Sequence, residues 1–202
     1  TNTPVWGTCI TPITDANIQT AVDLWVSDSF AATTTYGEIA TWDLSQVTDM
    51  SNLFQNKNTF NDDISNWDVS NVTNMSSMFN DCISFNQDLS NWNTTNVTDM
   101  NRTFRHCRQF NQDISVWDVS NVIDMELMLY DCKVFNQDIS GWCVTNITSE
   151  PQAFSANSAL SSTNTPVWGT CPKTPITSAN FITAINTCLS TNPVDGMCSD
   201  SE

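Results

Sequence analysis

Aspartates that recur at one fixed interval are the first side chains in this sequence that could do chemistry. The column consists of Asp63, Asp88, Asp113 and Asp138. A stacked row of carboxylates could bind Ca²⁺, which takes oxygen ligands. The alternative is that each aspartate accepts a hydrogen bond from the backbone of its own turn. A calcium-binding repeat would carry Gly and Asp at alternating positions, and this one does not. We therefore expect a structural role and no cofactor, with calcium as the alternative.

Six Asn-x-Ser/Thr sequences form a second set of reactive positions, because such asparagines accept N-linked glycans in extracellular eukaryotic proteins. They are Asn71, Asn74, Asn93, Asn96, Asn101 and Asn146. Three of them share one column with the same interval, so glycans at these positions would line one face of a repeating structure. Asn, Ser and Thr are abundant in this chain, and chance alone produces some of these sequences. We expect covalent glycans on part of the set.

Eight cysteines in a chain with only six Lys and Arg indicate an oxidising compartment. Three of them share a column on an apolar face: Cys82, Cys107 and Cys132. We expect these three to be buried, reduced thiols that act as small hydrophobic side chains. Cys143 and Cys171 are expected to form a disulfide that holds residues 163–171 over the last repeat.

The remaining cysteines fall near the two ends of the sequence. Cys188 and Cys198 bracket a turn with Pro193 and Gly196, which predicts a local disulfide. Cys9 is expected to pair with a cysteine of a preceding unit.

A catalytic constellation is missing from the sequence. His106 is the only histidine and lies between Arg105 and Arg108, so we expect it on a solvated face. No Ser-His-Asp or Cys-His pairing, phosphate-binding glycine loop or zinc spacing is found. We therefore expect that the protein is not an enzyme, although the many carboxylates leave paired acids open.

Net charge limits the partners. The 202 residues include 22 Asp and Glu against six Lys and Arg, which gives a net charge of −16. Such a surface repels nucleic-acid phosphates and anionic lipid, so neither is an expected partner. No apolar run reaches the roughly 18 residues of a membrane helix, and no membrane insertion is expected. Without a signal peptide at Thr1, we interpret the sequence as a mature chain or an internal piece of a longer one.

The aspartate, asparagine and cysteine columns all recur every 25 residues, and this period predicts the elements that position them. Tryptophans mark it at positions 42, 67, 92, 117 and 142. A period of this size is typical of stacked repeats that share one core. Residues 71–75 read as a short strand, and residues 75–82 carry apolar side chains at helical spacing. The pattern predicts an α/β fold, a right-handed leucine-rich-repeat-like solenoid of five coils, each with a short parallel strand and a short helix.

A longer period overlies the short one, because residues 2–9 and residues 164–171 have the same sequence, NTPVWGTC. The duplication predicts a tandem array of units, each of about 162 residues. We divide the chain into a tail of the preceding unit at 1–9, a helical cap and loop at 10–40, repeats at 41–160, a disulfide-stapled strap at 161–172, and the start of the next unit's cap at 173–202.

The repeat FNQDISVWDVSNVIDM, at Phe110–Met125, resembles the BspA-like bacterial surface-protein repeat, a relative of leucine-rich repeats with about 25 to 26 residues. The resemblance covers about residues 41–160. It implies a secreted or surface-anchored protein with an adhesive or structural role. Departures from the pattern are Leu129 for Phe, Asn93 for Asp, Lys57 for Cys, and the last repeat's Trp142-Cys143, which look like local tuning and capping.

These observations together predict a non-catalytic structural unit of an extracellular, glycosylated fibre or surface appendage, in which copies join head to tail. The alternative is a surface adhesin that binds a protein or glycan ligand through the face of the repeats. Either role places the protein outside the cell or on its surface.

Overall fold

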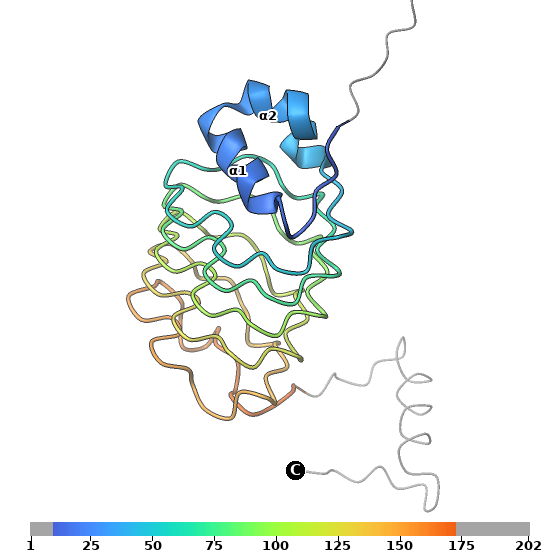
Figure 1. The fold of residues 1–202 in the computed structure, drawn as a ribbon. Coiled ribbons are helices and arrows are strands. Elements are labelled where there is room, and N and C mark those ends of the chain that lie inside the picture. Colours follow the sequence, from blue (N-terminus) through green and yellow to red (C-terminus); the bar gives the residue numbers. More distant parts are fainter. Residues whose placement is uncertain (1–9, 173–202) are drawn as a thin grey trace, which may run out of the picture. The chain divides into compact units, whose positions relative to one another are not determined.

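The structure is a computed structural model that describes residues 10–172 (Figure 1). The chain divides into two compact units, Thr1–Cys171 and Pro172–Glu202, and the following account concerns the first. Its helices lie at the amino-terminal end: α1 (Ile18–Ser27), α2 (Ser29–Tyr36) and the short 3-10 helix η1 (Ile39–Thr41). From residue 42 onwards the chain winds in turns, one winding below the next (Figure 1). Within the described residues, no helix is long and apolar enough to cross a membrane.

Helix α1 follows from its apolar spacing. Ile18, Ala21 and Val22 are buried on one side of it, and the partly buried Trp25 packs on the same core. The sequence predicts a helical cap followed by a loop over 10–40, but after α1 the structure has α2 and η1 in place of the loop. Asp28 begins α2 by accepting a hydrogen bond from the Ala31 N–H at 3.0 Å.

The predicted α/β, leucine-rich-repeat-like solenoid is wrong. Over residues 10–172 the structure has no strand or sheet, and its two α-helices both precede the repeats. The predicted parallel strands are reduced to three isolated bridges, which join Asp49 to Asn74, Asn74 to Asp99, and Asp99 to Asp124. We use the term repeat stack for residues 42–160, in which successive repeats are joined by hydrogen bonds between turns.

Left-handed residues explain why residues 75–82 are not a helix. Ser77 and Asp81 have φ angles of +57° and +63°, which a right-handed helix does not allow. The chain instead makes consecutive tight turns, with the N–H of Met78 donating to the Met75 carbonyl at 3.1 Å. The intervening N–H groups point to the next repeat, as when Phe79 donates to the Thr103 carbonyl at 2.9 Å. The left-handed residues recur every four positions. Apolar side chains three and four positions apart therefore fit this ribbon of turns as well as they fit a helix.

Columns of apolar side chains fill the inside of the repeat stack. Neighbouring tryptophan rings from Trp42 to Trp117 stack with centroids 6.0 to 6.4 Å apart. The indole N–H groups of Trp92, Trp117 and Trp142 also donate to carbonyls of the previous winding, as when Trp92 donates to Ile64 at 3.1 Å, and the Trp67 indole donates to the Ile39 carbonyl of η1. Each fully buried side chain of this kind contributes about 1.5–3 kcal/mol before the entropy of ordering is subtracted. The tryptophans therefore both fill the core and set the spacing between repeats.

Candidate functional site

The column of turn aspartates is occupied by local hydrogen bonds. Each carboxylate accepts from the backbone N–H of the serine two positions later, at 2.9 to 3.0 Å; the acceptors are Asp63, Asp88, Asp113 and Asp138. Hydrogen bonds from Ser65 and Ser115 lower the pKa of Asp63 and Asp113. Residues 10–172 contain no group of three or more His, Cys, Asp or Glu side chains arranged to hold a metal ion. The hydrogen bonds from Ser65, Ser90, Ser115 and Ser140 to these carboxylates shape the turns.

The asparagine column that carries three of the glycosylation sequences forms a ladder between repeats. The side-chain nitrogens of Asn71, Asn96 and Asn146 donate to backbone carbonyls of the previous repeat at 3.1, 2.7 and 2.8 Å. Asn121, which lies in the same column without a glycosylation sequence, makes the same bond at 2.8 Å. The column is therefore part of the framework that holds the repeats together.

The other three candidate asparagines differ in their surroundings. Asn101 donates its side-chain nitrogen to Asp124 at 3.1 Å, and Asn74 is half-buried. Asn93 is exposed, and its side-chain oxygen accepts from the Thr95 N–H at 3.2 Å. Its side-chain nitrogen has no hydrogen-bond partner within the described part of the chain. Asn93 is thus the candidate that is most open to modification in the folded protein.

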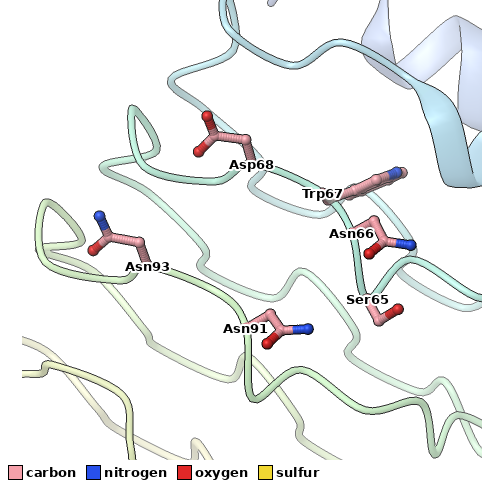
Figure 2. A pocket seen from close by; sticks show the side chains of 6 residues that line it. All are labelled: Ser65, Asn66, Trp67, Asp68, Asn91 and Asn93. Atoms are coloured by element: carbon pink, nitrogen blue, oxygen red, sulfur yellow. The ribbon is translucent and has the colours of Figure 1, made fainter.

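A hollow beside Asn93 lies between the second and third repeats (Figure 2). It is lined by Ser65, Asn66, Trp67, Asp68, Asn91 and Asn93. Figure 2 shows Asp68 and Asn93 on neighbouring windings, with Ser65, Asn66 and Asn91 on the other side. The Trp67 ring is only 2% exposed, so the hollow offers amide, hydroxyl and carboxylate groups and no open aromatic surface.

A cluster of cations surrounds the buried carboxylate of Asp131, whose side chain is 10% exposed. Arg108 Nε donates to it at 2.9 Å and Lys133 Nζ at 2.5 Å, and His106 Nδ1 lies 3.2 Å away. Burial alone would raise the pKa of Asp131, but the hydrogen bonds from Lys133, Arg108 and His106 outweigh it and lower the pKa to about 2. His106 is therefore half-buried and paired, and its expected place on a solvated face is wrong.

Sequence reasoning missed this cluster, although one signal was present. Arg108 and Lys133 occupy the same position in neighbouring repeats, and therefore lie in one column. Two cations that follow one another in a column of an acidic protein indicate a nearby anion, and in the structure Asp131 lies between them.

The three cysteines of the inner column are buried thiols. The Cys82, Cys107 and Cys132 sulfurs each donate to a phenylalanine carbonyl of the previous repeat, at 2.9 to 3.0 Å. Burial raises the pKa of Cys82 to about 12, and it raises the pKa of Cys107 and Cys132 as well. Their thiolates are therefore scarce at neutral pH.

Residues 161–172, the closing strap, cover the last repeat. The Asn164 side chain donates to the Asn136 carbonyl at 3.1 Å, and the Ile139 N–H donates to the Asn164 carbonyl at 3.0 Å. Further along, the Gly169 N–H donates to the Ile147 carbonyl at 2.8 Å. The strap thus supplies partners for backbone groups that a further repeat would otherwise satisfy.

A disulfide and an aromatic contact complete the strap. Cys143 is bonded to Cys171, the pair expected from the sequence, with Cα atoms 4.0 Å apart. Trp168 packs edge-on against Phe154, with ring centroids 4.9 Å apart. Cys9 and the expected Cys188–Cys198 pair lie outside the described residues.

A family model with the description "Mycoplasma protein of unknown function, DUF285" matches the sequence twice, over residues 25–142 and 89–168. The two matches together span the repeat stack and most of the strap. No curated protein and no solved structure matched the chain.

Proposed function

The chain belongs to this DUF285 family, and from that premise we propose that it is a non-catalytic structural unit of an extracellular, glycosylated fibre or surface appendage, built from tandem units of about 162 residues. The family description assigns no activity, so the proposal rests on the residues and their contacts. Copies of the unit are the main partners, joined head to tail.

The closing strap carries this proposal. Residues 164–171 seal the last repeat through hydrogen bonds, the Trp168–Phe154 contact and the Cys143–Cys171 disulfide. The same sequence occurs at 2–9. A segment that closes a repeat stack, and whose sequence occurs twice in the chain, supports an array in which each stack has its own strap.

The opposite end of the stack is also closed by the unit's own residues. Asp15 accepts hydrogen bonds from the first repeat at Thr48, and Gln19 of α1 donates to the Leu53 carbonyl at 3.1 Å. Lys57, which stands where later repeats have Cys, pairs with Asp23 of α1 at 2.6 Å. A stack closed at both ends favours discrete units in a string over one continuous run of repeats.

Surface chemistry supports an extracellular setting. The Cys143–Cys171 disulfide favours an oxidising compartment, and the exposed Asn93 is available for glycan attachment. The resemblance to BspA-like surface repeats also favours the cell surface. The Asp, Asn and Cys columns, which were the candidates for chemistry, are used in hydrogen bonds within and between repeats, and this favours a structural role over catalysis.

Electron microscopy tests the proposal. The material would be extracted from the source cells and compared with a recombinant chain of three consecutive units. We expect rods in both samples, with a constant axial repeat that corresponds to one unit. Units without constant spacing, or a native protein that is a monomer with a ligand bound in the hollow beside Asn93, would overturn the fibre in favour of an adhesin.

A further inference from the structure

We propose that Arg108 and Lys133 of one copy dock on the aspartate column of a second copy, so that repeat stacks associate side by side. The column consists of Asp63, Asp88, Asp113 and Asp138. The inference goes beyond the proposed head-to-tail array, because it concerns the sides of the stack and needs only one unit in each chain.

The few cations of this acidic chain gather in two neighbouring repeats. Five of the six Lys and Arg lie within residues 10–172, and four of those five are Arg102, Arg105, Arg108 and Lys133. The fifth, Lys57, is paired with Asp23 of α1 at 2.6 Å. In a chain with a net charge of −16, this part of the surface is where an anionic partner meets the least repulsion.

Arg108 and Lys133 keep part of their binding capacity after pairing with Asp131. Their side chains are 49% and 50% exposed, whereas that of Asp131 is 10% exposed. Arg108 uses only Nε on this carboxylate, and its two terminal nitrogens have no hydrogen-bond partner within residues 10–172. A guanidinium binds a carboxylate through two parallel hydrogen bonds, so a second carboxylate fits these two nitrogens.

The aspartate column offers matching acceptors on an exposed surface. Each carboxylate accepts the serine N–H of its own turn through Oδ1, and its Oδ2 has no hydrogen-bond partner among the residues that the structure describes. Hydrogen bonds from the serines also lower the pKa of Asp63, Asp113 and Asp138, so these side chains are ionised at neutral pH. The column therefore presents a row of charged oxygens to a partner.

The interval between the cations equals the interval between the aspartates. Arg108 and Lys133 each lie two residues before a phenylalanine of the stacked core, and each aspartate lies three residues after one. The phenylalanines that follow the two cations, Phe110 and Phe135, have ring centroids 5.8 Å apart. One winding thus separates the cations, as it separates successive aspartates, and two cations of one copy match two aspartates of the other.

A second copy fits both sets of charges at once. The cations and the aspartates belong to the same repeats, so a two-fold axis brings each set onto the opposite set of the partner, as in isologous dimers. An acidic polysaccharide supplies carboxylates to the cations but no cations to the aspartates. Exposed ion pairs are individually weak, so single units pair weakly and many units along a fibre pair strongly.

Zero-length cross-linking tests the contact directly. Equal amounts of unlabelled and ¹⁵N-labelled full chain are mixed at physiological salt, treated with a carbodiimide and digested for mass spectrometry. We expect peptides of mixed isotope composition that join Lys133 to an aspartate of the column. Lys133 joined only to acids of its own chain, or joined to the exposed Asp28 as often as to the column, would overturn the proposal.

Sedimentation equilibrium of variants measures the same contact without chemistry. Asp113→Asn/Asp138→Asn should weaken self-association by about five-fold, because ion pairs on both sides of the two-fold axis are lost. The turns should persist, since Asn74 accepts the same kind of backbone bond. Asp43→Asn/Glu150→Gln is the matched control, because it removes two exposed charges outside the column and should leave association unchanged. Equal weakening by both pairs would mean that net charge alone controls association, and would contradict the docking.

Alginate, a polyuronate, separates the second copy from a polysaccharide partner. A full chain that stays monomeric at millimolar concentration, yet binds alginate less well after Arg108→Gln, would overturn docking between copies. That result would leave the head-to-tail fibre intact if microscopy still shows a constant axial repeat, so the two proposals fail separately.

Discussion

The Asp15 carboxylate accepts two hydrogen bonds from Thr48, one from its backbone N–H at 2.8 Å and one from its hydroxyl at 2.7 Å. In the following repeats the corresponding partner is a backbone carbonyl: the N–H and the hydroxyl of Thr73 both donate to the Thr48 carbonyl, at 2.8 and 3.2 Å. Asp15 therefore supplies, for the first repeat, the acceptor that a preceding repeat would supply.

Replacing Asp15 with Ala should lower the free energy of unfolding by about 1–2 kcal/mol, because three donors of the first repeat lose a charged acceptor at an exposed site. Burial raises the pKa of Asp15, but the hydrogen bonds from Thr48 and Asp49 outweigh it and the pKa is lowered. The contribution is therefore present above the ordinary pKa of 3.8 and is lost as the pH falls through the lowered value.

Urea unfolding of the variant at pH 7 and in acid measures both effects. Glu150→Gln is the control, since Glu150 is exposed and makes no hydrogen bond within the described residues. If Asp15→Ala lowers the free energy of unfolding no more than Glu150→Gln does, the first repeat does not need the Asp15 carboxylate as an acceptor.

Replacing Trp92 with Phe should lower the free energy of unfolding by about 2–4 kcal/mol. The change removes the indole N–H that donates to the buried Ile64 carbonyl and leaves a gap in the tryptophan column. Trp25→Phe is the matched control, because the Trp25 indole donates to the exposed Asp62 at 2.7 Å. Chemical denaturation should give a clearly smaller loss for the control. If the two variants lose the same free energy of unfolding, the indole hydrogen bonds of the tryptophan column contribute no stability beyond that of burying the rings.

Replacing Asp99 with Asn should raise the free energy of unfolding by less than about 1 kcal/mol at pH 7. Burial raises the pKa of Asp99, the hydrogen bond from Asn101 opposes the rise, and Asp124 and Asp49 add to it. Asn74 already holds the equivalent position and accepts the same backbone bond, from Ser76 at 2.9 Å. The substitution therefore keeps the hydrogen bond and removes the repulsion.

The pH dependence of this gain has a definite sign. A raised pKa means that ionised Asp99 costs stability above the ordinary value of 3.8, so the advantage of the variant should vanish below that pH. Asp113→Asn is the control of opposite sign, since hydrogen bonds from Ser115 lower the pKa of Asp113. Unfolding curves between pH 3 and pH 7 that show no gain for Asp99→Asn would rule out repulsion in this column.

Replacing Ala153 with Gly should raise the free energy of unfolding by about 0.5 kcal/mol. Ala153 has a φ of +50°, a left-handed conformation that costs an L residue about 1–2 kcal/mol and that glycine adopts without this cost. Glycine also has more conformational freedom in the unfolded chain, and losing that freedom on folding costs about 0.5–1 kcal/mol. The same change at Ala31, inside α2, should lower stability by about 0.5–1 kcal/mol. Thermal melts of the two variants should shift in opposite directions, and shifts in the same direction would contradict the assigned backbone strain.

The inner side chains of the repeats could be predicted from the sequence, and the backbone that carries them could not. Trp67, Met75 and Phe85 are buried as their regular recurrence requires. The spacing of residues 75–82, however, fits a ribbon of turns as well as a helix. A better signal was the recurrence of Asn, Asp and His at Asn56, Asp81, His106, Asp131 and Asn157, since these residue types tolerate left-handed φ.

The features that break the period were the hardest to predict. Asp15 lies before the repeats, so no column marks it. The columns contain Asp131, Arg108 and Lys133, but the full set of contacts around Asp131 occurs once and does not follow from the period. The strap could be predicted because its sequence occurs twice in the chain and contains Cys171. The last repeat departs from the common pattern by carrying Cys143, which is a partner for that cysteine. Periodicity thus identifies what every repeat shares, whereas ends and charge clusters require contacts that only the structure supplies.

Replacing Asp131 with Asn should lower the free energy of unfolding by about 2 kcal/mol at neutral pH, because the half-exposed Arg108 and Lys133 lose their shared anion and His106 loses its carboxylate partner. The backbone should tolerate the change, since Asn56 and Asn157 hold equivalent left-handed positions. Because the pKa of Asp131 is lowered to about 2, its contribution is complete above the ordinary value of 3.8 and is lost as the pH falls towards 2.

Urea unfolding between pH 2 and pH 6 measures this contribution, and the difference between the two proteins should shrink below pH 4. Asp81→Asn is the control, because Asp81 is more exposed and its nearest cation, Arg105, is 3.8 Å away, so a smaller loss is expected. Added salt should reduce the loss at Asp81 more than the loss at the buried Asp131. A pH-independent difference for Asp131→Asn would mean that the carboxylate acts by shape alone, and that the surrounding cations do not depend on its charge.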